Sequence, residues 1–238
     1  MDLVEIELTE NEKELLAKQD KRIISNFEAT RLEKDARKNW DKFYMRNTTN
    51  FFKDRHWTER EFKELNPESW PDKKYTICES GCGVGNFIFP LLEEHSNIVA
   101  FACDFSQRAV DFVAKRADEQ NLSDRLTAFQ CDLTDIPLNE KIESKCDLVT
   151  MIFVLSAIHP SKFVTALKNL TSLLTIGGKL LFRDYAVNDH AMIRFKPGSK
   201  VTSSSFASSL TRHMSFRLQI ECMQDTMALG VISLTLKK

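Results

Sequence analysis

The chain of 238 residues lacks several features that would assign it to particular protein classes. It has no apolar run of about 18 residues, so we expect no membrane-spanning helix. The first 20 residues are acidic and polar without an apolar core, which argues against a signal or transit peptide. None of the six cysteines forms a Cys-x-x-Cys pair, so we expect neither a disulfide framework nor a metal site. A reducing cytoplasmic or nuclear setting fits this usage.

An excess of charge of one sign is also missing. The chain has 33 basic and 34 acidic residues, which gives a formal net charge of −1. Because 42% of the residues are hydrophobic, the chain can bury a sizeable core and is not a disordered polyelectrolyte. Its length fits a single α/β domain.

Glycine is scarce, with seven residues in the whole chain. Three of them fall within five positions: Gly81, Gly83 and Gly85. They follow a strand signal at 75–80, so this turn needs unusual backbone freedom or allows a ligand to approach closely. A dinucleotide fingerprint requires glycine at position 86, where Asn86 stands. Glu79 adds a negative charge before the turn, which suits a cationic ligand better than a pyrophosphate.

The pattern beyond residue 74 alternates between strand and helix signals. Strands are predicted at 75–80, 98–103, 126–130, 147–154 and 179–183, with helices near 86–94, 106–120 and 161–174. Before them we predict a helix over 10–46 and a short one over 59–65; after them come a turn at 177–178 and weaker strands at 215–222 and 231–236. This alternation is typical of a Rossmann-like α/β fold, with a mostly parallel sheet covered by helices on both faces.

Acidic residues stand at the ends of three successive predicted strands. Glu79, Asp104 and Asp132 are therefore expected at the carboxyl edge of the sheet, where open α/β sheets bind ligands. A carboxylate at Asp104 can accept hydrogen bonds from both hydroxyls of a ribose. Asp132 can accept from an adenine amino group, and the Leu133 N–H can reach a ring nitrogen. Taken singly, the glycine turn is often only a tight turn, and Asp104 could cap a helix.

The joint pattern of Glu-x-Gly-x-Gly-x-Gly, the later aspartate and Cys-Asp-Leu at 131–133 resembles the class I S-adenosylmethionine-dependent methyltransferases. The resemblance implies S-adenosyl-L-methionine as cofactor. It places the glycine turn beside the methionine part, Asp104 at the ribose, and Asp132 with Leu133 at the adenine. Ile152, at the end of the fourth strand, would line the same pocket.

Two amino-terminal motifs narrow this resemblance. Lys-Asn-Trp-Asp-Lys-Phe-Tyr at 38–44 and Asn-Phe-Phe-Lys-Asp-Arg-His-Trp at 50–57 resemble the tRNA 3-methylcytidine methyltransferases, as do the stretches at 153–160 and 181–185. The resemblance covers residues 20–198 and implies methylation at position 32 of the anticodon loop. The short acidic start and the Lys-Asn-Trp-Asp form look most like the serine-tRNA branch, in which seryl-tRNA synthetase is an expected helper.

Aromatic residues in the amino-terminal part have two interpretations. Trp40 and Tyr44 share one helix face, which usually means core packing, whereas the family resemblance makes them a lid over the cofactor near its cationic sulfonium. Residues 50–57 mix rings with cations, a combination that grips single-stranded bases: Phe51, Phe52, Lys53, Arg55 and His56. The alternative is a surface loop anchored by its two phenylalanines. Residues 31–60 carry a local excess of +4, a modest footprint for phosphate.

The candidate catalytic residues lie at the ends of the fourth and fifth strands and in the aromatic segment. Asp184 follows an apolar strand where the pocket is expected to open, and Tyr185 stands beside it for substrate contact. We expect Asp184 to favour the positive charge of the product base and Arg55 to assist. His159 is more often structural, and Arg183 fits a strand-end salt bridge equally well.

Three regions are predicted along the chain. Residues 1–70 form a capping and tRNA-binding extension, 71–198 the methyltransferase domain, and 199–238 an atypical end that holds the last two strand signals. The family resemblance stops near Gly198, because the following residues lack the aromatic-rich stretch of the family. One alternative is therefore a catalytically weak module that binds tRNA or a synthetase; another is a methyltransferase of proteins or small molecules.

Overall fold

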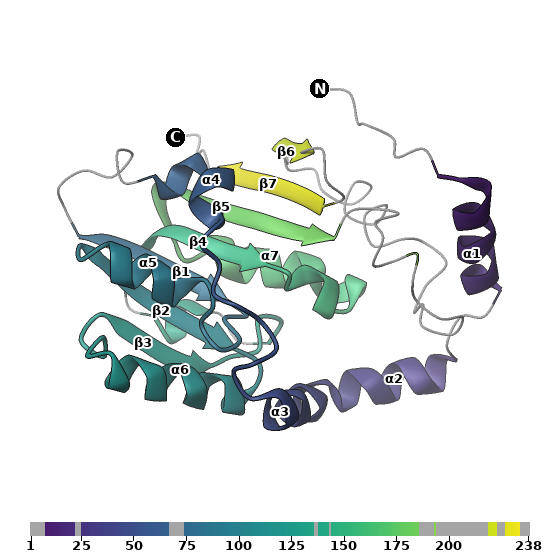
Figure 1. Ribbon diagram of the computed structural model, residues 1–238, viewed down its shortest axis with the longest axis horizontal. Coiled ribbons are helices and arrows are strands. Elements are labelled where there is room, and N and C mark those ends of the chain that lie inside the picture. The colour runs from purple at the N-terminus through teal and green to yellow at the C-terminus, as the bar shows by residue number, and fades with distance from the viewer. Residues whose placement is uncertain are drawn as a thin grey trace.

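The computed structural model describes residues 8–21, 25–66, 74–135, 138–142, 144–185, 193, 219–222 and 227–233, with the backbone alone at 139, 185, 219–222 and 227–233. Its centre is a seven-stranded sheet in the order β3-β2-β1-β4-β5-β7-β6 (Figure 1). The strands are β1 (Tyr75–Ser80), β2 (Ile98–Asp104), β3 (Leu126–Gln130), β4 (Cys146–Ile152), β5 (Leu174–Tyr185), β6 (Gln219–Cys222) and β7 (Met227–Ser233).

The first five strands are parallel, as the alternating pattern predicts. β4 lies between β1 and β5 and is buried along most of its length, which explains its nearly continuous apolar run. The two strand signals of the carboxyl-terminal region correspond to β7, antiparallel to β5, and β6, antiparallel to β7. β6 covers the described part of the predicted range 215–222, of which 215–218 lie outside the described residues, and β7 begins at 227 rather than at the predicted 231.

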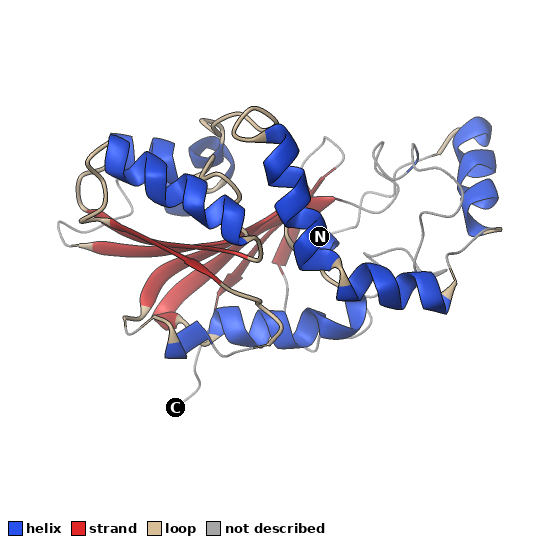
Figure 2. Ribbon diagram, turned by 90° about the horizontal axis from the view of Figure 1, so that it is seen from below, coloured by secondary structure: helices blue, strands red, loops and turns tan. Residues whose placement is uncertain are grey.

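Helices cover both faces of the sheet (Figure 2). On one face α5 (Ile88–Glu94) and α6 (Gln107–Glu119) pack against β1 and β2 in a core that includes Ile77 and Val113. On the other face α7 (Phe163–Thr171) packs against β4 and β5. The short 3₁₀ turns are η3 (Leu138–Glu140), η4 (Leu155–Ala157) and η5 (Pro160–Lys162). Within the described residues, no helix is both long and apolar enough to span a membrane.

The amino-terminal region is not one helix over 10–46, as predicted, but three. These are α1 (Glu10–Asp20), α2 (Asn26–Lys34) and α3 (Ala36–Asn47). Ser25 starts α2 in a capping box with Glu28, so the backbone amides of a new helix end are satisfied there. Asp35, with ψ near 3°, interrupts the helix between α2 and α3.

The predicted short helix over 59–65 is divided into α4 (Thr58–Glu61) and η1 (Lys63–Leu65). Phe62 lies between them in an extended conformation, and its ring is fully buried together with Leu65. Burying this ring pins the segment to the core beside α5, and the helix is interrupted at that residue.

The turn predicted at 177–178 lies inside β5, which starts at Leu174. Pairing with β4 passes from Cys146↔Leu174 to Leu148↔Lys179, so β5 accommodates three additional residues there. Gly177 has φ +84°, a conformation that glycine adopts readily. The glycine pair therefore marks an irregularity within the strand.

Candidate active site

A cavity of about 1130 Å³ opens at the carboxyl ends of the parallel strands. In Figure 1 the arrowheads of these strands point toward the side on which α2 and α3 lie. The cavity is lined by residues from α2, α3, the segment after α3, the glycine turn and the ends of β2, β4 and β5. Its position is the one that the acidic residues after successive strands predict.

The glycine turn forms one wall of the cavity, and all three of its glycines have positive φ. The angles are +62° at Gly81, +55° at Gly83 and +83° at Gly85. A Cβ on Gly83 would lie 2.9 Å from the Tyr44 hydroxyl, and one on Gly81 would lie 2.4 Å from Val154 Cγ2. Both the backbone conformation and the close approach therefore require glycine.

Asp104 joins the end of β2 to the glycine turn. Its Oδ2 accepts the Gly83 N–H at 2.8 Å, and its Oδ1 accepts the Ser106 N–H at 2.9 Å. Burial raises the pKa of Asp104, whereas these backbone donors lower it. The residue that caps α6 is Ser106, so Asp104 lines the cavity and is not the N-cap.

Glu79 is a buried carboxylate at the end of β1. Burial raises its pKa to about 8, while the Arg55 guanidinium and the Ile88 N–H lower it. Its Oε2 has no hydrogen-bond partner among the described residues. A buried acceptor that lacks a donor fits a cationic ligand group, because such a group would satisfy the oxygen and favour the ionised carboxylate.

The third acidic position continues the same wall. Asp132 Oδ1 accepts the backbone N–H and the hydroxyl of Thr134 at 2.8 and 2.7 Å. The Leu133 carbonyl accepts Asn169 Nδ2 from α7 at 2.8 Å. Ile152 is buried at the end of β4, and all three predicted residues line the cavity.

Trp40 and Tyr44 line the cavity from α3 and also pack against neighbouring side chains. Their rings stack at 6.1 Å, and Tyr44 packs against Val84 and Ala109. Burial, followed by Asp104, raises the pKa of Tyr44, so its hydroxyl stays protonated. Asp41, which sequence reasoning missed, ties α3 to α6 by accepting the Ser106 hydroxyl at 2.5 Å.

The segment from Phe51 to Trp57 crosses from α3 to α4 beside the glycine turn. The rings of Phe51 and Phe52 contact Phe43 at 4.9 and 6.2 Å and remain 58% and 41% exposed. The Arg55 N–H donates to the Asn86 carbonyl at 2.7 Å. Phe52, Lys53 and Arg55 line the cavity.

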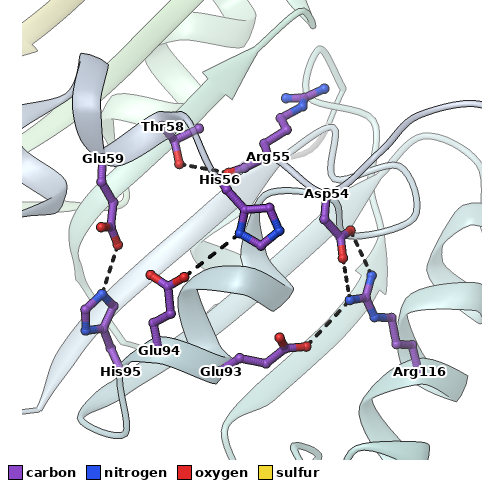
Figure 3. Close-up of polar contacts among 9 residues, drawn as sticks. All are labelled: Asp54, Arg55, His56, Thr58, Glu59, Glu93, Glu94, His95 and Arg116. Carbon is purple, nitrogen blue, oxygen red and sulfur yellow. Dashed lines mark hydrogen bonds and ion pairs between the residues drawn. The ribbon is translucent and has the colours of Figure 1, made fainter.

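Figure 3 shows how this segment is held on its far side. Asp54 forms a bidentate ion pair with Arg116 of α6, with N–O distances of 2.8 and 3.0 Å. His56 Nδ1 faces Glu94 at 3.9 Å, so the side chain of this predicted substrate residue is directed at α5 and does not line the cavity.

One group of side chains in the described part of the chain has metal-ligand spacing. Potential ligand atoms of Glu59, Glu94 and His95 lie within 4.8 Å of one another. His95 already pairs with Glu59 at 3.0 Å, and none of the three lines the cavity (Figure 3). These contacts attach α4 to the end of α5.

The ends of β4 and β5 carry the remaining candidate residues. Asp184 is buried, lines the cavity and accepts the Ser156 N–H at 2.9 Å. Arg183 forms an ion pair with Glu61 of α4, which confirms the salt bridge considered for it. The side chain of Tyr185 lies outside what the structure describes.

Phe153 is a site residue that sequence reasoning missed. It directly follows β4 and has φ +59°, which is uncommon for a residue with a large side chain. The guanidiniums of Arg55 and Arg183 lie 5.4 and 5.9 Å from its ring centroid. Backbone strain of this kind gathers at functional sites, but it leaves no signal in the sequence. His159, by contrast, accepts the Ser161 N–H as the cap of η5, a structural role.

Comparison with known proteins places this geometry among methyltransferases. Residues 78–180 match a protein family described as methyltransferase domain. The tRNA N(3)-cytidine methyltransferase METTL6 of Rattus norvegicus is 55% identical over 196 residues, covering 82% of this chain and 67% of that protein. The Homo sapiens METTL6 is 50% identical, covering 82% and 68%.

Two more distant matches concern a tRNA enzyme and the fold. A Saccharomyces cerevisiae protein named tRNA(Thr) (cytosine(32)-N(3))-methyltransferase is 35% identical, covering 80% of this chain and 31% of that protein. The solved structure of an O-methyltransferase family protein from Burkholderia thailandensis has a TM-score of 0.52 at 16% identity, covering 69% and 52% of the two chains.

Proposed function

The chain belongs to the tRNA N(3)-cytidine methyltransferase family, and we propose that it methylates cytidine 32 in the anticodon loop of serine tRNAs. Its fold is that of the class I S-adenosylmethionine-dependent methyltransferases, and its methyl donor is S-adenosylmethionine. The observation that carries the proposal is the cavity, which joins the acidic wall of the sheet to the aromatic and basic segment at 51–57.

The residues at the cavity wall fit the cofactor. The glycine turn provides a wall that side chains would block, and the unpartnered oxygen of Glu79 fits a positively charged group. We assign Asp104 to the ribose, Asp132 with Leu133 to the adenine, and Ile152 to the apolar wall. Trp40 and Tyr44 would cover this half from α3. When bound, S-adenosylmethionine supplies a methyl group activated by a sulfonium.

Orientation of the target base is the main task left to the protein. Cytosine N3 carries a free lone pair at neutral pH, so no residue has to remove a proton from it. Alignment alone can contribute about 7–11 kcal/mol. Arg55 and Phe153 offer a cation and a ring face to a base, and Asp184 offers a negative charge that favours the cationic product.

Access to N3 requires an unpaired base, because this atom lies on the Watson–Crick edge. The exposed rings of Phe51 and Phe52 and the exposed Lys53 stand at the end of α3, next to the cavity. Rings that stack on bases and a cation that attracts phosphate suit an anticodon loop. We assign these three residues to tRNA binding.

The choice of tRNA is the finer part of the proposal. Serine tRNA, with seryl-tRNA synthetase as helper, is supported by the amino-terminal motifs at 38–44 and 50–57. Since the yeast relative is named for tRNA(Thr), threonine tRNA is the necessary comparison. Mass spectrometry of nucleosides should detect 3-methylcytidine after purified protein, cofactor and serine tRNA are incubated with and without the synthetase.

A serine tRNA with uridine at position 32 is the matched control and should yield no product. Product on threonine tRNA alone would contradict the serine assignment and retain the reaction. Binding of serine tRNA without turnover in either condition would instead support the alternative, a catalytically weak tRNA-binding module.

A further inference from the structure

Two electrostatic interactions, each between an arginine and a glutamate, connect the segment at 55–61 with the sheet. Arg55 of the segment lies near enough to Glu79 of β1 to lower the pKa of that carboxyl. Arg183 of β5 forms an ion pair with Glu61 of α4. The segment and the sheet therefore each contribute one arginine and one glutamate: Arg55 and Glu61 from the segment, Arg183 and Glu79 from the sheet.

Arg183 contacts more than its carboxylate partner. Its side chain is 15% exposed, and its guanidinium lies 4.3 Å from the ring centroid of Trp57. Its carbonyl accepts the Phe153 N–H at 2.7 Å, and its guanidinium lies 5.9 Å from the Phe153 ring. Arg183 thus contacts α4 through Glu61, the residue before α4 through Trp57, and the end of β4 through Phe153.

The charges of Arg55 and Arg183 explain why the position of the segment depends on the ion pair between Arg183 and Glu61. Arg55 and Arg183 both approach the Phe153 ring, so the cations repel each other across a partly buried space. Burial adds to the cost of each charge. Glu61 offsets the repulsion between Arg183 and Arg55, and removing the charge of Glu61 would leave that repulsion less compensated.

We propose that Arg183 is a positioning residue, which holds residues 55–61 against the sheet so that the Arg55 guanidinium stays over Phe153 at the cavity. The proposal rests on the proposed function, because it assigns Arg55 and Phe153 to the target base. Arg183 itself contacts Glu61, Trp57 and Phe153 and acts on the base through them.

A neighbouring ion pair provides a matched control. Lys179 of β5 pairs with Glu64 of η1 at 3.1 Å, so it joins the same strand to the turn that directly follows the segment. Neither residue lines the cavity. If Arg183 merely adds an ion pair between strand and segment, Lys179→Gln should have the same consequences as Arg183→Gln.

The experiment compares Arg183→Gln, Arg183→Lys, Glu61→Gln and Lys179→Gln in the full chain. Hydrogen exchange of residues 51–62, read by mass spectrometry, reports on the position of the segment without any activity. We expect faster exchange there in Arg183→Gln and Glu61→Gln, and exchange near that of the unaltered chain in Lys179→Gln. Arg183→Lys should lie between, because an ammonium keeps the charge but loses the flat stacking on Trp57.

Kinetics with tRNA provide the second measurement. A displaced Arg55 should lower kcat about a hundredfold, the cost typical of a misplacement near 1 Å. KM for tRNA should change less than kcat, because the rings of Phe51 and Phe52 also pack against Phe43 of α3. An unchanged kcat in Glu61→Gln, or an equal loss in Lys179→Gln, would overturn the proposal.

The two measurements separate failure of the proposal from failure of the proposed function. If the unaltered chain methylates no tRNA, the proposed function is wrong, and the exchange measurement still decides whether Arg183 positions the segment. Unaltered exchange at 51–62 in both Arg183→Gln and Glu61→Gln would overturn the positioning role whatever the activity. Glu61→Gln covers the case in which Arg183→Gln fails to fold.

Discussion

Asp104 shows how one carboxylate can serve a ligand and the fold together. Both of its oxygens already accept backbone N–H groups, from Gly83 and from Ser106. A substitution that removes the charge therefore disturbs the glycine turn as well as the ribose position assigned to it. The substitution Asp104→Asn is informative. In either orientation of its side-chain amide, the NH₂ group faces one of the two backbone donors, the N–H of Gly83 or the N–H of Ser106.

We predict that Asp104→Asn weakens binding of S-adenosylhomocysteine by about tenfold or more, since a charged hydrogen bond contributes about 1.5–3 kcal/mol. The free energy of unfolding should fall as well, by about 1–3 kcal/mol, because a buried donor loses its acceptor. Calorimetric titration and urea unfolding measure the two effects. Asp111→Asn, an exposed change on α6, is the control; unchanged affinity in Asp104→Asn would refute the ribose assignment.

Glu79 makes the stability of the ligand-free protein depend on pH. Its pKa is raised to about 8 in the folded state, above its value in an unfolded chain, chiefly by burial. The folded state therefore holds a proton that the unfolded state releases. Stability from this group is complete below the unfolded pKa and is lost as the pH rises toward 8.

A consequence for binding can be measured directly. At pH 7 Glu79 is mostly protonated, and a cationic group beside it should ionise it, so we predict that binding of S-adenosyl-L-methionine, which carries a sulfonium and an ammonium, releases close to one proton. Calorimetry in buffers with different ionisation enthalpies counts this proton. Glu79→Gln should abolish the release, and equal release in both proteins would assign the proton to another group.

At the scale of elements, the segment between α3 and α4 joins the two halves of the cavity. Phe52 is 41% exposed and lines the cavity, so its ring has a free face for a base. We predict that Phe52→Ala weakens tRNA binding by about 1–3 kcal/mol, the contribution of one stacked base. S-adenosylhomocysteine affinity should stay unchanged.

Fluorescence anisotropy with a labelled anticodon stem-loop measures the tRNA affinity. Phe27→Ala removes a ring that is 75% exposed on α2 and outside the cavity lining, so it controls for a general loss of aromatic surface. Equal affinities for Phe52→Ala and the unaltered chain would indicate that Phe52 only anchors the segment to Phe43.

The elements also show which parts of the structure can be predicted from sequence. β1 and β3 match their predicted ranges, because apolar strands bounded by turn residues are local patterns. The break at Ser25 had a readable signal, since Ser25 and Glu28 form a capping box, whereas the mostly polar run over 10–46 favoured one helix. The contacts of Arg183 with Glu61 and Trp57 join distant parts of the chain, so no local pattern encodes them.

At the scale of the molecule, the carboxyl-terminal strands complete one side of the sheet. β7 pairs with β5 from Lys179 to Tyr185, and β6 covers the other edge of β7. Without them β5 would become an exposed edge beside the buried Leu180 and Phe182, which favours aggregation.

We therefore predict that deleting residues 199–238 lowers the melting temperature by about 5 °C or more, since 1 kcal/mol corresponds to about 2–4 °C at this size. Gly230→Pro should act in the same direction, because Gly230 stands in the middle of β7 and proline cannot donate to the ladder. Scanning calorimetry measures both variants. A melting temperature unchanged by the deletion would show that β6 and β7 add nothing to stability.

The ion pair between Glu61 of the segment and Arg183 of the sheet also has a consequence for the order of events during synthesis. Arg183 follows Glu61 by 122 residues, so the segment leaves the ribosome long before the strand that holds it exists. At about 5–20 residues per second this interval lasts roughly 6 to 24 s. During this interval Glu61 and Trp57 lack the contacts with Arg183 that attach them to β5. The segment at 55–61 is therefore synthesised first, and Arg183 can hold it only after β5 has been made.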